Sequence, residues 1–275
     1  MYYFQTNKTT KLNDSESKTT FYVVTGRGPS NQMHLGHLIP FIMAKWLQQE
    51  FNCNVYIQLA DDEKFLNKQH SMNTIRDYAY ENLRDIAALG FNEDKTFMFS
   101  DTDYIKNIYQ LALRGAKQLD FGKIKNTLGL SGVKNPALYF YPALQITPMM
   151  FEENRKCLSV IGLDQYAYVQ IQNEIASRLH CDKAASLASK FLPSLNNNQG
   201  KMNASLPDGT IYLSDSTKEV EMKIEQFANS KSFIEKAYHF LYYLSDGNDN
   251  VIKSLELLSG KRKRLAIKNL LKKKV

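Results

Sequence analysis

The sequence lacks the features that mark membrane and secreted proteins. Its 275 residues contain no apolar run near the ~18 residues that are needed to cross a bilayer. Residues 1–20 are mostly polar and have no apolar core of the kind found in signal peptides. We therefore predict a cytoplasmic protein that makes no membrane contact.

Cysteine is also scarce. The three cysteines, Cys53, Cys157 and Cys181, are scattered, and none belongs to a close pair or to a metal-ligand spacing. The odd count favours buried free thiols in a reducing compartment. The sequence thus gives no sign of a disulfide framework, and we expect no metal-ligating residues.

Acidic residues are missing from the end of the chain. Residues 261–275 hold eight basic side chains and no acidic one, so subtracting them from the net charge of +7 leaves −1 for the remainder. Such a basic segment is able to contact the phosphates of a nucleic acid through counterion release. A solvated helix end that contacts nothing is the alternative.

Short apolar runs alternate with helix-period segments over most of the chain. The composition is 43% hydrophobic, which is enough for a sizeable core. This alternation favours parallel strands joined by right-handed helical crossovers, and ligands of such sheets bind at the carboxyl ends of the strands. The expected strands cover residues 21–25, 55–59, 96–99 and 157–161, and the expected helices cover 38–51, 74–89 and about 165–179.

The turn after the first expected strand combines glycines with two histidines. Residues 25–37 run Thr-Gly-Arg-Gly-Pro-Ser-Asn-Gln-Met-His-Leu-Gly-His, and a helix should begin at the end of this segment. A helix N-terminus offers unpaired N–H groups and the positive end of its dipole, so it suits a phosphate. His34 and His37 would add donors to a phosphoryl group. Histidines that only cap the helix are the structural alternative.

A second motif, Lys-Met-Asn-Ala-Ser at residues 201–205, lies in a polar loop far downstream. Together with residues 33–37, it resembles the two signature motifs of class I aminoacyl-tRNA synthetases. Further segments narrow the resemblance to tryptophanyl-tRNA synthetases of the eukaryotic and archaeal type: residues 25–30, 58–64, 141–145 and 163–165. The resemblance covers residues 20–225 well and the C-terminal region more loosely.

This resemblance implies chemistry in two steps. An amino-acid carboxylate, most simply that of tryptophan, attacks the α-phosphate of ATP, which gives an aminoacyl-adenylate and pyrophosphate. The aminoacyl group then passes to the terminal ribose of a tRNA. The implied cofactors are ATP and Mg²⁺, and the family suggests a homodimer.

The resemblance also assigns roles to individual residues. The catalytic group would neutralise charge on the phosphates and consists of His34, His37, Lys201 and Arg27. The ATP-binding group would comprise Gly26, Gly28, Gly36, Gly162, Asp164, Met202 and Ser205. The amino-acid-binding group would comprise Val24, Gln58, Glu63, Lys64, Gln145, Pro148 and Gln165.

On this basis we expect an α/β fold with a Rossmann-like parallel sheet, helices on both of its faces and a small helical appendage. A flexible arm should cover residues 1–20. A Rossmann-type catalytic domain should cover 21–215, with a helical insertion at about 104–150. A shortened helical domain that ends in the basic tail should cover 216–275.

Several positions depart from the family pattern. Val24 stands where the family has a tyrosine that helps to recognise the indole ring, while Gln58, the other indole partner, is present. Gln170 and Asn173 replace two arginines, and Asn203 replaces a serine. These departures leave two alternatives open. One is a paralogue that activates a tryptophan analogue or another amino acid for a biosynthetic pathway, and the other is a non-catalytic module that binds nucleotide or RNA.

Overall fold

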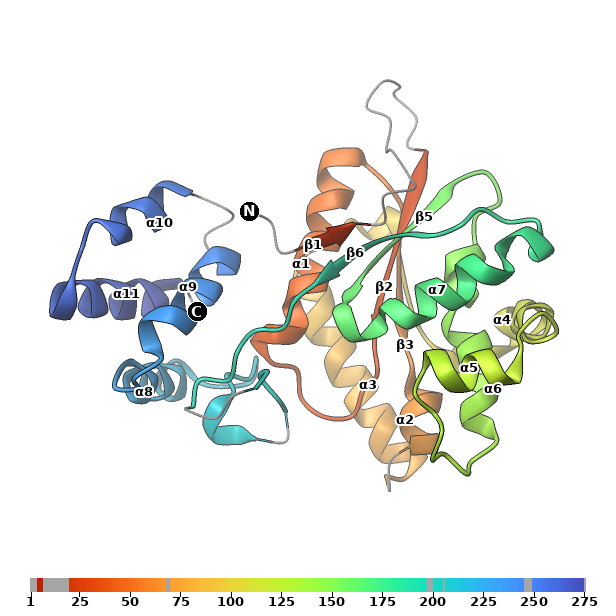
Figure 1. Cartoon of the computed structure of the whole chain (residues 1–275), viewed down its shortest axis with the longest axis horizontal. Helices are drawn as coiled ribbons and strands as arrows, with labels where there is room; N and C mark the ends of the chain where they lie inside the picture. Colours follow the sequence, from red (N-terminus) through yellow and green to blue (C-terminus); the bar gives the residue numbers. More distant parts are fainter. Residues whose placement is uncertain are drawn as a thin grey trace. The chain divides into compact units, whose positions relative to one another are not determined.

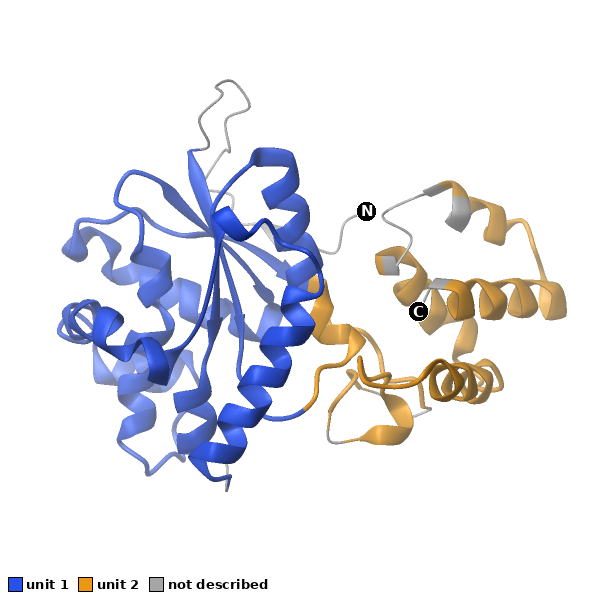
Figure 2. Ribbon diagram, turned by 180° about the vertical axis from the view of Figure 1, so that it is seen from behind, with its two compact units in different colours: residues 1–31, 40–190 blue, residues 32–39, 191–275 orange. Residues whose placement is uncertain are grey.

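The computed structural model describes residues 4–6, 20–67, 70–196, 200–204, 206–244 and 249–274. Contacts divide the chain into two compact units, which Figure 2 shows in blue and orange. Unit 1 comprises residues 1–31 and 40–190, and unit 2 comprises residues 32–39 and 191–275. The expected arm over residues 1–20 lies outside the described residues, apart from residues 4–6 and 20. The domain limits that we inferred from the sequence stay predictions.

Unit 1 is built on a 6-stranded sheet with the order β1-β6-β5-β2-β3-β4 (Figure 1). Five neighbouring strands are parallel, and β1 alone pairs antiparallel, with β6. This arrangement confirms the predicted α/β, Rossmann-like fold class. The strands are β1 (Phe4–Thr6), β2 (Phe21–Arg27), β3 (Val55–Leu59), β4 (Thr96–Ser100), β5 (Lys156–Gly162) and β6 (Ala185–Ser189).

The central strands are apolar on both sides because helices cover both faces of the sheet. Val23, Val55 and Ile57 are fully buried, as expected for parallel strands enclosed by helical crossovers. Figure 1 shows α1 and α3 on one side of the sheet and α5, α6 and α7 on the other. The helices that contribute to unit 1 are α1 (Leu35–Phe51), α2 (Asp61–Asn67), α3 (Met72–Ala87), α4 (Asp101–Ala116), α5 (Phe121–Thr127), α6 (Ala137–Gln145) and α7 (Tyr166–Ile175).

Helix α1 is divided between the two units. Its first turn, up to Ile39, belongs to unit 2, and the helix continues in unit 1 from Pro40. Proline has no N–H, so Pro40 cannot make the helical hydrogen bond to the carbonyl of Gly36. The break in the hydrogen-bond ladder therefore falls at the boundary between the units.

Unit 2 is helical and has a core of its own. Phe233, Leu241 and Ile267 are fully buried there, and the rings of Phe227 and Phe233 meet edge to face with their centroids 4.9 Å apart. A capping box between Ser216 and Glu219 fixes the start of the first helix. The helices are α8 (Thr217–Ala228), α9 (Phe233–Leu244), α10 (Asp249–Glu256) and α11 (Gly260–Lys274).

The basic C-terminal segment forms helix α11, which packs into the core of unit 2 through residues such as Ile267. Lys268 and Lys272 each bind the carboxylate of Glu225, at 3.1 and 2.6 Å. Arg264 donates to the carbonyl oxygen of Ser230 at 3.0 Å, just beyond the end of α8. The ammonium of Lys263 also lies 5.3 Å from the centre of the Tyr238 ring, so at least four of the eight basic side chains make contacts within unit 2.

The core of unit 2 gives a first testable expectation. Leu241→Ala should lower the free energy of unfolding by about 2–5 kcal/mol, because it removes a fully buried side chain and leaves a cavity. Urea denaturation followed by circular dichroism measures the loss. Leu265→Ala, at a side chain that is 54% exposed, is the matched control and should change the free energy by less than about 0.5 kcal/mol. Equal effects of the two substitutions would contradict this assignment of the core.

Candidate functional site

The glycines that follow β2 allow close approach of neighbouring groups in unit 1. A Cβ on Gly26 would lie 2.4 Å from the carbonyl oxygen of Gln58 on β3, which no side chain tolerates. A Cβ on Gly28 would lie 2.1 Å from Cε of Lys64. The Lys64 ammonium is held 2.6 Å from the carboxylate of Glu63. Gly26 and Gly28 therefore make room for β3 and for Lys64.

Arg27 ends β2 and points back to the loop that follows it. Its Nη2 donates to the carbonyl oxygen of Asn31 at 3.0 Å, and the same oxygen accepts from Nδ2 of Asn82 at 3.2 Å. Burial lowers the pKa of Arg27 to about 9, so the group remains charged at neutral pH. The turn thus contains a buried positive charge within unit 1.

Val24 and Gln58 lie on the same face of the sheet. Val24 is in register with Tyr56 on β3 and Ser159 on β5, and all three are directed to the face covered by α7. The Tyr56 hydroxyl donates to Glu152 Oε1 at 2.9 Å. The Tyr56 hydroxyl is therefore engaged by Glu152. It does not replace the tyrosine hydroxyl that the family resemblance leads us to expect at position 24.

The Gln58 side chain is only 2% exposed and is held by its amide nitrogen. Nε2 donates to Oδ1 of Asp101 at 2.8 Å and to Oδ2 of Asp101 at 3.1 Å. It also lies 3.4 Å from the carbonyl oxygen of Leu144. Gln58 is thus a buried polar group with a fixed partner at the end of β4.

Two more predicted amino-acid-binding residues lie around α6. Tyr141 donates its hydroxyl hydrogen to Oε1 of Gln145, and the carbonyl oxygen of Pro148 accepts from the Tyr22 hydroxyl at 3.2 Å. Burial raises the pKa of Tyr141 and of Tyr22 far above the ordinary value, so both phenols stay neutral. The rings of Tyr141 and Tyr168 are 5.9 Å apart and meet edge to face.

The predicted ribose-side residues follow β5. The strand ends at Gly162, and a single 3-10 turn, Leu163–Gln165, leads into α7. This turn places Asp164 and Gln165 at the carboxyl edge of the sheet, where ligands of parallel sheets bind. Since β5 is the neighbour of β2, these residues and the Gly26–Gly28 turn belong to the same edge of unit 1.

The two histidines of the first motif belong to unit 2 and stack on each other. Their ring centroids are 3.5 Å apart with an angle of 21° between the planes. The backbone N–H of His34 donates to Nδ1 of His37 at 3.2 Å, so a neutral His37 carries its hydrogen on Nε2. A Cβ on Gly36 would lie 3.1 Å from Cε1 of His34, and the glycine therefore leaves space for that ring.

The loop of the second motif is anchored in unit 2 by its backbone. Lys201 pairs with Pro193 in a short antiparallel bridge, and its Nζ lies 4.1 Å from the centre of the Phe191 ring. The N–H of Met202 donates to the carbonyl oxygen of Leu192 at 2.8 Å, and the Met202 side chain is buried in the core of the unit. Ser205, predicted to bind ATP, lies outside the described residues.

Three aspartates meet where β3 and β4 end. Asp61 is fully buried and accepts from Oγ of Ser100 at 2.8 Å, which indicates a structural role. Asp62 Oδ1 accepts from the backbone N–H of Glu63 at 2.7 Å, and its Oδ2 is buried without a hydrogen-bond partner. Burial and the neighbouring carboxyl charges raise the pKa of Asp62 to about 6 and that of Asp101 well above the ordinary value, so both groups hold a proton more tightly than a free carboxyl group does.

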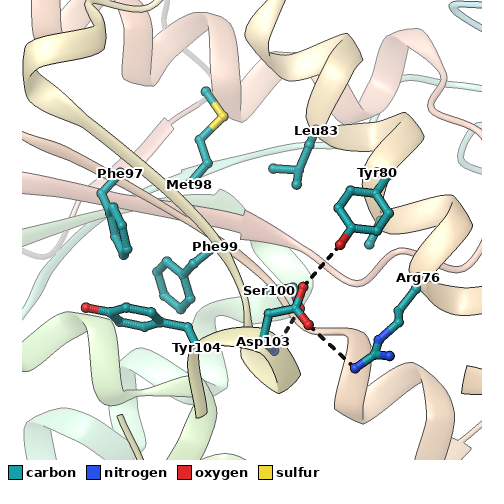
Figure 3. A pocket seen from close by; sticks show the side chains of 10 residues that line it. Arg76, Tyr80, Leu83, Phe97, Met98, Phe99, Ser100, Asp103 and Tyr104 are labelled. Atoms are coloured by element: carbon teal, nitrogen blue, oxygen red, sulfur yellow. Dashed lines mark hydrogen bonds and ion pairs between the residues drawn. The ribbon is translucent and has the colours of Figure 1, made fainter. Parts of the chain in front are cut away.

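A pocket of about 240 Å³ lies beside β4, and none of the predicted site residues lines it (Figure 3). Its one polar corner is formed by Asp103, whose carboxylate lies 3.5 Å from both Arg76 Nη2 and the Tyr80 hydroxyl. Most of the other lining residues are apolar: Ala79, Leu83, Phe97, Met98, Phe99 and Tyr104, together with Ser100.

The described ranges contain neither a metal-binding cluster nor a helix that could span a membrane. No group of three or more His, Cys, Asp or Glu side chains there is placed to hold a metal ion. No helix within the described part of the chain is long and apolar enough to cross a membrane.

Comparison with known proteins gives the family. The model of the class I tRNA synthetases for W and Y matches residues 16–275. The chain belongs to this family. It is 44% identical to the tryptophan--tRNA ligase of Saccharolobus solfataricus over 281 residues, which span 94% of this chain and 74% of that synthetase.

Solved synthetases have the same fold. The tryptophanyl-tRNA synthetase of Encephalitozoon cuniculi, solved bound to tryptophan, has a TM-score of 0.84 and 27% identity, and the match covers 93% of this chain and 76% of that one. The synthetase of Plasmodium falciparum has a TM-score of 0.75 and 32% identity, with 93% and 77% coverage. The resemblance to tryptophanyl-tRNA synthetases that the sequence motifs suggested is therefore confirmed.

No functional role was assigned from the sequence to Asp62, Asp101, Tyr141 and Tyr168, which lie among the predicted residues. Asp101 directly follows β4, so its position at a strand end was a signal that could have identified it.

The buried carboxyl pair predicts a pH dependence of stability. The folded state binds the Asp62 proton with a pKa of about 6, against 3.8 for the free side chain, so stability falls as the pH rises through this range. The slope for one proton is at most about 1.4 kcal/mol per pH unit. Asp62→Asn should remove this loss of stability. The free energy of unfolding of the variant should therefore rise relative to that of the wild type as the pH increases from 4 to 6. Urea unfolding across that range measures the difference.

Asp103→Asn, at a side chain that is 50% exposed, is the control and should leave the pH dependence unchanged. A difference in unfolding free energy between Asp62→Asn and the wild type that stays constant from pH 4 to 6 would count against the raised pKa of Asp62.

Proposed function

We propose that this chain activates tryptophan with ATP and transfers the tryptophanyl group to a tRNA. The observation that carries the proposal is the stacked pair His34 and His37 at the start of α1, with Lys201 in the same compact unit. The names of the relatives, tryptophan--tRNA ligases, support the choice of amino acid.

In the first step, the carboxylate oxygen of the amino acid forms a bond to the α-phosphorus of ATP. The bond from that phosphorus to the bridging oxygen breaks, and pyrophosphate leaves with the electron pair. We assign His34, His37 and Lys201 to the phosphates, because an imidazole N–H and an ammonium stabilise charge that develops on phosphate oxygens. The Nε2–H of His37 is suited to this role, since its Nδ1 already accepts a hydrogen bond.

The remaining nucleotide residues have supporting roles in the proposal. Arg27 adds a positive charge, and Asp164 accepts from ribose hydroxyls. Mg²⁺, when bound, shares the charge of the phosphates. The described residues form no three-ligand metal cluster, so such an ion would take ligands from ATP itself. The other residues assigned to ATP have no charged group. The glycines let the nucleotide approach the backbone closely, and Met202 packs behind the loop: Gly26, Gly28, Gly36, Gly162 and Met202.

The proposed amino-acid-binding residues of unit 1 fall into groups according to the part of the substrate that each would contact. We assign the substrate ammonium to Glu63, Gln145 and Gln165 and the substrate carboxylate to Lys64. Val24 and Pro148 provide apolar contacts for the ring. Gln58 is the acceptor for the indole N–H, because it is a buried polar group whose amide nitrogen is already occupied.

One observation supports the paralogue alternative. Val24 offers no hydrogen bond, and the neighbouring Tyr56 hydroxyl is bound to Glu152, so a tryptophan analogue with a different ring remains a second candidate substrate. ATP–pyrophosphate exchange with all amino acids distinguishes the candidates. Exchange that depends on tryptophan, followed by charging of tRNA, supports the first proposal. Exchange without charging of any tRNA supports the paralogue.

The Lys201 side chain gives a direct test of the catalytic assignment. Lys201→Ala should slow adenylate formation at least tenfold while the unfolding free energy changes little, because the side chain is exposed. Pre-steady-state adenylate formation and urea denaturation measure the two effects. Lys218→Ala, at an exposed lysine of α8, is the control and should leave both unchanged. Unaltered exchange in the Lys201 variant would refute its role.

We also propose that the protein is a homodimer. The support is the edge strand β4, where Phe97 is 39% exposed and borders the apolar pocket of Figure 3. Phe97→Glu should shift the sedimentation coefficient toward that of a monomer, and Leu257→Glu, at a side chain that is 89% exposed in unit 2, should not. A monomeric wild type would overturn the proposal.

A further inference from the structure

We propose that Asp101 is a positioning residue for amino-acid specificity: it fixes the Gln58 amide so that the pocket recognises a ring that donates an N–H group. This inference rests on the proposed tryptophan activation. It concerns a residue that contacts Gln58 and not the substrate.

Three oxygen atoms surround the Gln58 nitrogen. Both carboxyl oxygens of Asp101, at 2.8 and 3.1 Å, and the carbonyl oxygen of Leu144, at 3.4 Å, are directed to Nε2. If the Gln58 amide were rotated by 180°, its oxygen Oε1 would face the same three oxygen atoms. Since opposed acceptors repel and a buried unpaired polar atom is costly, one orientation of the amide is strongly preferred.

The preferred orientation determines what Gln58 offers to a ligand. With Nε2 committed to Asp101, the remaining polar atom is Oε1, which accepts no hydrogen bond from any other described residue. Gln58 shares its sheet face with Val24, the position that lacks a hydroxyl group. Gln58 Oε1 is therefore an acceptor presented beside an apolar surface.

The position of Asp101 is itself tightly determined. It is fully buried as the first residue of α4, directly after β4. Ser100 caps the same helix by accepting from the N–H of Asp103 at 3.3 Å. A fully buried side chain at a capped helix start has little room to turn and follow the glutamine.

The test compares two substrates that differ only in the ring heteroatom. Tryptophan carries N–H, and β-(benzothiophen-3-yl)alanine carries sulfur at the same place and cannot donate. Wild type should prefer tryptophan by roughly 10- to 100-fold in kcat/KM for ATP–pyrophosphate exchange. In Asp101→Asn, an amide faces the Gln58 amide, either orientation is satisfied, and the preference should fall at least fivefold.

Separate kinetic constants distinguish positioning from structural damage. In Asp101→Asn we expect KM for tryptophan to rise about tenfold, while KM for ATP and the constants for the sulfur analogue change less than threefold. In a Gln58→Met background, the same substitution should have no further effect on the preference. Asp103→Asn is the control, because the Asp103 side chain faces Arg76 and Tyr80 instead (Figure 3).

Several outcomes overturn the inference. An equal loss for tryptophan and the sulfur analogue would make Asp101 merely structural, and an undiminished preference would remove it from specificity. If Asp101→Asn does not fold, a wild type that fails to discriminate the two substrates, or a Gln58→Met variant that still discriminates them, refutes it. The absence of exchange with tryptophan in the wild type would be a failure of the proposed function, which separates the two hypotheses.

Discussion

The close approach of β2 and β3 at Gly26 is the constraint on which unit 1 depends. No Cβ fits beside the carbonyl oxygen of Gln58, so the parallel register that pairs Gly26 with Gln58 requires glycine at this position. That register brings the turn after β2 and the aspartates after β3 and β4 to the same edge of the sheet. It also places Val24 and Gln58 on one face of the sheet. The arrangement of the residues that we propose for amino-acid binding thus depends on a single tight contact between backbones.

A cluster of buried carboxyl groups at the ends of β3 and β4 is the second feature that shapes unit 1. Asp61, Asp62 and Asp101 lie within one cluster, and burial would destabilise three independent charges. Hydroxyl and backbone donors bind Asp61, and the Gln58 amide binds Asp101. The pKa of Asp62 and that of Asp101 are raised, which lowers the charge that the cluster carries.

Strong local patterns made much of the fold predictable. The strand Val55–Leu59 was predicted with the bounds that the structure shows, because bulky β-branched residues lie between clear breaks. The strand Ala185–Ser189 was missed, since alanine and serine give no strand signal and the segment is defined by its pairing with β5. Helix α1 begins at Leu35, three residues earlier than expected, because the chain outside the helix holds this residue: its N–H donates to the carbonyl oxygen of Ile211.

Candidate site residues could be named from the sequence where motifs are local. His34, His37 and Lys201 were proposed from short motifs, whereas the partnership of Gln58 with Asp101 joins residues 43 positions apart and needs the sheet register. The basic segment at the C-terminus illustrates the opposite error. Its charge suggested a tail, but its apolar period at Ile267 and Leu271 makes it a packed helix.

The division of α1 between the units has an evolutionary consequence. The histidines at its start share a compact unit with the Lys201 loop, while the residues that we propose for amino-acid binding belong to the other unit. Substitutions among those proposed residues, such as valine at position 24, therefore need not disturb the contacts that hold the histidines. Under the proposed roles, the preference for a substrate and the chemistry of activation can diverge at different rates along one polypeptide.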